Sequence, residues 1–312
     1  MPNTTCSTGD NLEIVLVGFL GLHDIQHWLS IPFFIMFLMS FFGNLIILLI
    51  IATEQRLHEP MYYFIFMLSA ADLVLAVSLL PKLLVVLWYG SILLNFNGCL
   101  AQLFVIAFSS AMESSILALM AYDRYIAVTK SLRYRSIIKN QFILRISLFV
   151  TVRNFCIILP LPVLAKILPY YRVTTMYSVY CDYLAVSNAA CAQTAMSEIY
   201  KYIFIIIVAP SDIALIGLSY FKIARAVLKL DSREARQKAF NTCSSHIFVM
   251  VVFYLSGFMS IIRAVYDGKA PKDIPVLFSV LYITVPTTLN PLIYGIKTKE
   301  IRQVILKYLR KC

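Results

Sequence analysis

The chain has 312 residues, of which 60% are hydrophobic and 14% are charged, and its mean hydropathy is +0.80. This composition leaves too few polar side chains to cover a soluble domain, so it predicts an integral membrane protein. The net charge of +11 does not indicate nucleic-acid binding, because the basic residues lie between and after apolar stretches.

Residues 1–27 lack the basic region and long apolar core of a signal peptide. The stretch Asn11–Leu22 is too short and too interrupted to cross a bilayer. We therefore expect 1–27 to be a short, exposed extracellular segment. Asn3 starts the sequon Asn3-Thr4-Thr5, which can be glycosylated only if this end reaches the secretory lumen.

Seven stretches are apolar over the length of about 20 residues that one helix needs to cross a bilayer. No linker rich in proline, glycine or serine divides them, so residues 28–296 are expected to form one bundle. The spans are Trp28–Ala52, Met61–Trp88, Cys99–Val128, Phe142–Ala165, Tyr202–Phe221, Ala239–Ile262 and Ile274–Ile296.

Lysine and arginine are concentrated after the first, third, fifth and seventh spans, and the other connections are poorer in them. Because basic connections stay in the cytoplasm, the N-terminus is expected outside and the C-terminus inside. The odd number of spans and the sequon agree with this orientation. Residues 297–312 place apolar side chains at helical spacing among basic ones, which predicts an amphipathic helix on the lipid of the inner leaflet.

Polar residues occur inside several spans, where a charge is costly unless it is paired or functional. Gly43-Asn44 lies in the first span, Asp72 in the second, and Asn290-Pro291 through Tyr294 end the seventh. Asp123-Arg124-Tyr125 lies at the inner end of the third span. Alone, this acid–base pair would be interpreted as a salt bridge at a helix end. Asp212 is a further buried acid, to which the sequence assigns no role.

Taken together, these motifs resemble the rhodopsin-like G-protein-coupled receptors over nearly the whole chain. Pro60-Met61-Tyr62, Met120–Tyr125, Ser219-Tyr220 and Lys238–His246 narrow the resemblance to odorant receptors, nearer the fish-like class I branch. The resemblance implies an all-α bundle in the plasma membrane of sensory cilia. Such a receptor binds a small volatile or water-soluble odorant and activates a stimulatory G protein that raises cAMP. It is not an enzyme and, a sodium ion aside, needs no cofactor.

The resemblance also implies roles at the cytoplasmic end. Asp123 would hold Arg124 at rest and release it to the G protein, while Tyr220 and Tyr294 would move inward on activation. His246 would either hydrogen-bond near Arg124 or serve as a structural histidine. The full set implied for coupling is Asp123, Arg124, Tyr125, Tyr220, His246, Asn290, Pro291 and Tyr294.

Asp72 and Glu113 are expected to face each other inside the bundle. Two carboxylates at low dielectric cannot both ionise freely, so they would share a proton or bind a cation. We therefore predict a sodium site at Asp72, Glu113 and a hydroxyl of Ser114 or Ser69, in a polar network that includes Asn44.

Cys99 and Cys181 both face the oxidising side, where a disulfide between them is plausible and matches the common bridge of the family. Odorant receptors usually carry two further cysteines in the long outer loop. Cys191 occupies one of these positions, but Tyr171 occupies the other. Cys191 is then either a free thiol, which we favour, or a partner of Cys6.

The resemblance places the ligand among the outer halves of the third, fifth, sixth and seventh helices, with a mostly apolar lining that holds it by desolvation. Without the resemblance, each of these residues would be interpreted as helix packing. Lys201 and Arg263 near the mouth either reach lipid headgroups or bind an anionic ligand such as a carboxylic acid. The implied lining is Leu103, Ala107, Ser110, Ala111, Tyr183, Leu184, Lys201, Phe204, Val208, Tyr254, Phe258, Ile261, Arg263 and Ile283.

Other classes of membrane protein fit less well. A transporter would show an internal repeat, and a channel would show a filter motif or a ring of pore charges; neither pattern appears. An enzyme would need metal-ligand spacing, a phosphate loop or a nucleophile motif, and these are missing too. Within receptors, the alternative is a non-olfactory receptor for an endogenous metabolite, which no sequence feature separates from an odorant receptor.

Overall fold

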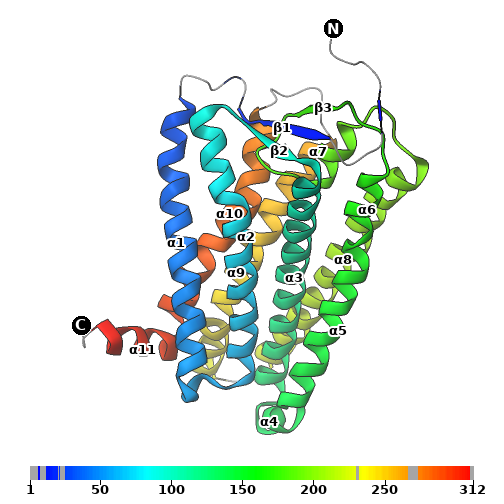
Figure 1. Cartoon of the computed structure of the whole chain (residues 1–312). Helices are drawn as coiled ribbons and strands as arrows, with labels where there is room; N and C mark the ends of the chain where they lie inside the picture. Colours follow the sequence, from blue (N-terminus) through cyan, green and yellow to red (C-terminus); the bar gives the residue numbers. More distant parts are fainter. Residues whose placement is uncertain are drawn as a thin grey trace.

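A computed structural model of the chain describes residues 6–7, 12–19, 21, 25–229, 232–265 and 273–309. Within these residues, long helices form a bundle whose outer end carries a small sheet (Figure 1). Asn3 lies outside the described residues. The membrane-crossing elements are α1 (Gln26–Thr53), α2 (Pro60–Tyr89), α3 (Phe96–Thr129), α5 (Asn140–Ile158) with α6 (Pro160–Lys166), α8 (Ala195–Leu228), α9 (Arg233–Val265) and α10 (Asp273–Lys297).

Six of these elements are long and apolar enough to cross a membrane, and α9 contains the shorter apolar stretch His246–Phe258. The predicted seven-helix membrane fold is confirmed. Helices α8 and α9 extend well beyond the predicted spans Tyr202–Phe221 and Ala239–Ile262. Hydropathy marks only the part of a helix that lies in hydrocarbon, whereas the backbone hydrogen bonds of these helices continue into polar, basic sequence.

Proline interrupts only one of the described membrane crossings. Pro160 stands at the start of α6, directly after the end of α5, because proline lacks an N–H and clashes with the preceding helical turn. The other prolines within the spans are accommodated in continuous helices. They are Pro32, Pro81, Pro162, Pro210, Pro275, Pro286 and Pro291.

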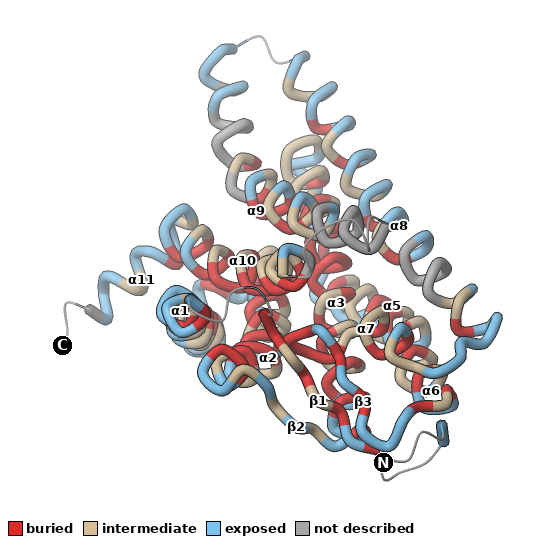
Figure 2. The backbone as a smooth tube through the Cα atoms, turned by 90° about the horizontal axis from the view of Figure 1, so that it is seen from above, coloured by how far each residue is buried: buried red, intermediate tan, exposed pale blue. Residues whose placement is uncertain are grey.

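A three-stranded sheet covers the outer helix ends, as seen from above in Figure 2. Strand β1 (Glu13–Val17) lies in the middle, antiparallel to β2 (Ser91–Asn95) and parallel to β3 (Val173–Met176). Because side chains alternate along a strand, Ile14 and Leu16 are buried while Glu13 is exposed. The expectation that residues 1–27 form an exposed segment was therefore wrong for residues 12–19.

The chain leaves α2 through Gly90, whose φ of 78° lies in the left-handed region that favours glycine. On the cytoplasmic side, α4 (Tyr134–Ile137) follows α3 after a short turn, and α11 (Lys299–Leu309) runs away from the bundle after α10 (Figure 1). The outer loop contains α7 (Tyr183–Asn188). Ile301 of α11 is buried, while Arg302 and Lys307 are exposed, as expected for an amphipathic helix.

Candidate functional site

The cytoplasmic end of the bundle contains an open cavity of about 1090 Å³. Its wall includes Arg124 of α3, His246 of α9, and Lys297 at the end of α10. Its lining contains both acidic and basic side chains.

Asp123 accepts a hydrogen bond of 2.7 Å from the hydroxyl of Tyr134 in α4. Among the described residues Asp123 forms no ion pair with Arg124, and the Arg124 Nε has no hydrogen-bond partner. The predicted resting contact between these two residues is thus absent from this conformation. Burial and the Asp123 carboxylate raise the pKa of Tyr134, so its hydroxyl stays protonated and donates.

Three further polar side chains surround Arg124. The hydroxyls of Tyr220 and Tyr294 and the Nδ1 of His246 are buried without a hydrogen-bond partner in the described part of the chain. The rings of His246 and Tyr294 lie 5.6 Å apart, so His246 packs against Tyr294 and its Nδ1 makes no bond to Arg124. Tyr125 lies beside Lys222, whose ammonium is 5.2 Å from its ring centre.

Asp72 and Glu113 lie side by side at the middle of the bundle, both fully buried. Asn290 donates a hydrogen bond of 2.9 Å to Asp72 Oδ2, but Asp72 Oδ1 and Glu113 Oε1 have no donor in the described residues. The Asn44 amide bonds the carbonyls of Ser40 at 2.9 Å and Thr287 at 3.0 Å, which ties α1 to α10. No group of three or more acidic, histidine or cysteine side chains that could hold a metal occurs among these residues.

The placement of Ser114 corrects the predicted sodium site. Its hydroxyl donates to Asp212 Oδ2 at 2.9 Å and lies 3.0 Å from the Tyr254 hydroxyl, so it is engaged away from Asp72. Asp212 in turn forms an ion pair of 3.0 Å with Arg153 Nη1. This contact supplies the role that the sequence left open for Asp212.

Arg153 lies at the centre of a network that joins α3, α5, α8 and α9. Its Nη2 donates to the Ser115 hydroxyl at 2.6 Å, and that hydroxyl also donates to Asp212 at 3.0 Å. Asn154 donates to Ser115 at 3.1 Å and accepts from the Arg153 Nε at 3.1 Å. Sequence reasoning missed Arg153, Ser115 and Asn154. The available signal was a charged residue in each of two apolar spans, an arginine in Phe142–Ala165 and an unexplained acid in the fifth span, but the sequence does not show that they face each other.

The residues predicted to line the ligand site fall into three groups. Leu103, Ala111, Tyr183 and Val208 are buried in one hydrophobic cluster near the outer end, with Ala107 packed against it. Ile283 joins a neighbouring cluster, Ser110 and Leu184 are half-buried, and Tyr254 belongs to the Arg153 network. Side chains at Lys201, Phe204, Ile261 and Arg263 lie outside the described part of the structure.

Phe258 was predicted to line the ligand site, and this prediction was wrong. Its side chain is 58% exposed on α9, which in a membrane means contact with lipid. Phe258 continues the exposed stripe that Val251 and Leu255 form along the same face of α9, and this face is the one turned away from the bundle.

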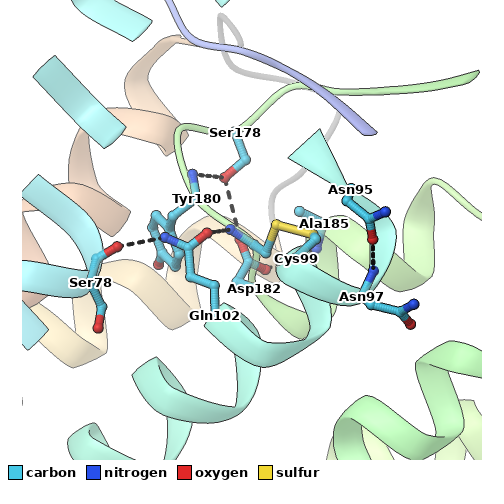
Figure 3. Close-up of a disulfide and its surroundings, with 10 residues drawn as sticks. Ser78, Asn95, Asn97, Cys99, Gln102, Ser178, Tyr180, Asp182 and Ala185 are labelled. Carbon is cyan, nitrogen blue, oxygen red and sulfur yellow. Dashed lines mark hydrogen bonds between the residues drawn. A yellow bond between two sulfur atoms is a disulfide. The ribbon is translucent and has the colours of Figure 1, made fainter. Parts of the chain in front are cut away.

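Two disulfides fasten the outer surface. The expected Cys99–Cys181 bridge is present, and Gln102 supports it by donating 2.8 Å to the Ser78 carbonyl and accepting 3.4 Å from the Cys181 amide (Figure 3). The second bridge joins Cys6 to Cys191. The free thiol that we favoured for Cys191 was therefore wrong: the partner missing at Tyr171 is supplied by the N-terminal segment.

Comparison with known proteins agrees with this architecture. The sequence profile of the olfactory receptor family matches residues 33–311. Human olfactory receptor 52A5 is 40% identical over 308 residues, covering 98% of each chain. Human olfactory receptors 52H1 and 52K2 are 38% and 40% identical over 292 residues, covering 94% of this chain and 93% of each relative. The chain therefore belongs to the olfactory receptor family, whose members are signalling receptors of the cell membrane.

Proposed function

We propose that the chain is an odorant receptor that binds a small molecule among the outer helix halves and couples to a stimulatory G protein, which raises cAMP. The observation that carries this proposal is the cytoplasmic cavity of about 1090 Å³, in which Arg124 has no ion-pair partner among the described residues. An amphipathic helix of the G protein enters this cavity and supplies acceptors for Arg124.

The two ends are connected through α9. Tyr254 reaches Ser114 below the proposed ligand site, and His246 of the same helix packs against Tyr294 at the cavity. A ligand that favours one position of Tyr254 therefore favours one position of the cytoplasmic half of α9. Such a ligand shifts the population toward the open cavity only by its difference in affinity for the two conformations.

We further propose that the Asp123–Tyr134 bond favours the conformation in which Arg124 is available to the G protein. Tyr134 removes Asp123 from competition for Arg124 and fixes the start of the loop that faces the G protein. The bundle ends at α11, whose Lys307 bonds Glu54 at 3.0 Å and whose exposed basic side chains attract anionic lipid of the inner leaflet.

We also propose that Asp72 and Glu113 hold a sodium ion in the resting receptor. The fit rests on two buried carboxylate oxygens, Asp72 Oδ1 and Glu113 Oε1, that have no hydrogen-bond donor among the described residues. Oxygen donors with net negative charge suit a hard monovalent cation, which would neutralise the acid pair. Ser114 takes no part, because Asp212 and Tyr254 engage its hydroxyl.

A cAMP assay in cells that carry the receptor to their surface tests the coupling. Arg124→Ala is expected to abolish basal and odorant-stimulated cAMP, because it removes the only cationic side chain of α3 that lines the cavity. Arg145→Ala is the matched control: Arg145 is exposed on α5 and does not line the cavity. Equal signalling by the wild type and Arg124→Ala, at equal surface expression, would refute the proposed coupling.

The sodium proposal has its own measurement. Purified receptor heated in NaCl should survive to higher temperature than in choline chloride of equal ionic strength, since a bound ion stabilises the state that binds it. Glu113→Gln and Asp72→Asn should each abolish this difference, while Ser114→Ala should retain it. A difference that persists in both acid variants would place sodium elsewhere.

A further inference from the structure

The described residues of the N-terminal segment contact separate parts of the outer face of the bundle. The amide of Glu13 donates to the Arg172 carbonyl at 2.9 Å, and the amide of Phe96 donates to the Leu12 carbonyl at 3.1 Å. Farther along, the Gly21 amide donates to Asp273 Oδ2 at 2.9 Å, at the start of α10. Strand β1, the middle strand of the sheet, therefore pairs with β2 and β3, while Leu12 before it and Gly21 after it contact the starts of α3 and α10 (Figure 1).

The inner side of β1 faces the proposed ligand region. Ile14 and Leu16 are 0% exposed and belong to the same hydrophobic cluster as Leu103, Tyr183 and Val208. Phe19 joins the neighbouring cluster that contains Ile283. The strand, together with Phe19 beyond it, therefore shares hydrophobic clusters with residues of α3, α7, α8 and α10 that were assigned to the ligand site.

A covalent bond holds this strand in place at one end. Cys6 is joined to Cys191, and the adjacent Ser7 exchanges backbone hydrogen bonds of 2.9 and 3.0 Å with Tyr170. Both sulfur-bearing residues are exposed, in contrast to the fully buried Cys99 and Cys181. Position 171 is a tyrosine, so Cys191 has no cysteine partner there within the outer loop. Its disulfide with Cys6 therefore joins the loop to the N-terminal segment.

We propose that residues 12–19 form the roof of the odorant site, that Ile14 and Leu16 contact the ligand and determine which odorants fit, and that the Cys6–Cys191 disulfide holds this roof closed. The inference rests on the proposed odorant-binding function. The alternation of the strand makes it specific: substitutions on its inner side change ligand selectivity, and those on its outer side do not.

The closed roof is tested without any odorant. Ala107→Cys places a thiol beside the cluster that contains Ile14, and a charged, membrane-impermeant methanethiosulfonate measures its accessibility in whole cells. With Cys6→Ser and Cys191→Ser added, labelling should be about tenfold faster or more. Without the disulfide, residues 12–19 can separate from the helix ends more often and expose the thiol. Asn97→Cys, which is exposed, should label equally fast in both backgrounds. Equal rates at Ala107→Cys in both backgrounds would refute the proposal that the Cys6–Cys191 disulfide holds the roof closed.

Selectivity is tested with straight-chain carboxylic acids and alcohols from butyl to decyl, with cAMP as the readout. Ile14→Ala and Leu16→Ala should change the ratio of EC50 values for long and short chains by about tenfold. The reason is that one methylene group more or less in an apolar site changes binding by about this factor. Glu13→Ala, on the outer side, should leave the ratio within about twofold. Unchanged ratios in both inner variants would refute ligand contact by the roof.

The two measurements separate the roof from the proposed function. Thiol labelling does not require G-protein coupling. Faster labelling without the Cys6–Cys191 disulfide would therefore support the roof even if Arg124→Ala leaves cAMP unchanged. Conversely, Arg124-dependent cAMP together with equal labelling rates would keep the receptor function and reject the roof.

Discussion

The bundle contains two groups of buried charges that are organised in opposite ways. In the Arg153 network, the Asp212 carboxylate receives hydrogen bonds at both oxygens, and the arginine donates to three different side chains. In the acid pair, Asp72 and Glu113 present like charges to each other, and each leaves one oxygen without a donor.

The difference teaches which parts of the molecule are fixed and which can move. A buried charge with a full set of partners resists displacement, because any movement leaves a charge uncompensated at low dielectric. An acid pair with unpartnered oxygens is stabilised when it binds a proton, an ion or a hydrogen-bond donor. We interpret the Arg153 network as the anchor of α3, α5 and α8, and the acid pair with the polar atoms around Arg124 as the part that changes on activation.

The largest expected effect is that of breaking the Arg153–Asp212 pair. Arg153→Met should destabilise the folded receptor by about 3–5 kcal/mol, since it leaves Asp212 buried and unpaired. Survival of the purified receptor after heating in detergent measures this loss. The double variant Arg153→Met/Asp212→Leu should recover most of it, and a double variant as unstable as the single one would contradict the interpretation.

The next effect concerns Asp123, a buried acid with one strong donor. Tyr134→Phe removes the 2.7 Å bond and should weaken G-protein coupling by about 1.5–3 kcal/mol, the range for a hydrogen bond to a charged group. Because the pKa of Tyr134 is raised in the folded protein, this bond is present below the ordinary tyrosine pKa and is lost only as pH rises through the raised value. Coupling measured between pH 6 and 9 on membranes should therefore show no alkaline loss in the wild type.

Removing one charge from the Asp72–Glu113 pair should stabilise the folded receptor, whereas removing one from the Arg153–Asp212 ion pair should destabilise it. Glu113→Gln gives Asp72 an amide donor and removes the like charge, so it should stabilise the receptor by about 1 kcal/mol in the absence of sodium. The same heating assay in choline chloride checks this result. A loss of stability as large as that caused by Arg153→Met would contradict the proposed difference between the acid pair and the Arg153 network.

The membrane-crossing fold was predictable because the bilayer imposes the requirement locally: every span must carry its own apolar stretch. The Arg153–Asp212 pair was not, since hydropathy does not indicate which faces of the fourth and fifth spans meet. The outer sheet depends on five residues, Glu13–Val17, whose partners lie in two distant loops. Such a short strand carries too little pattern to be recognised before its partners are known.

The smallest effect is expected at the exposed contact between α11 and the end of α1. The hydrogen bond and charge of Lys307 lower the pKa of Glu54, so the contact is present above the ordinary pKa of glutamate and is lost as pH falls through the lowered value. Lys307→Gln should therefore increase amide hydrogen exchange of residues 301–309 at neutral pH and low salt, but not at acid pH or high salt. Lys299→Gln removes the same charge from the same helix and leaves Glu54 with its partner. If both variants exchange alike, the helix is held by lipid and Ile301 rather than by this contact.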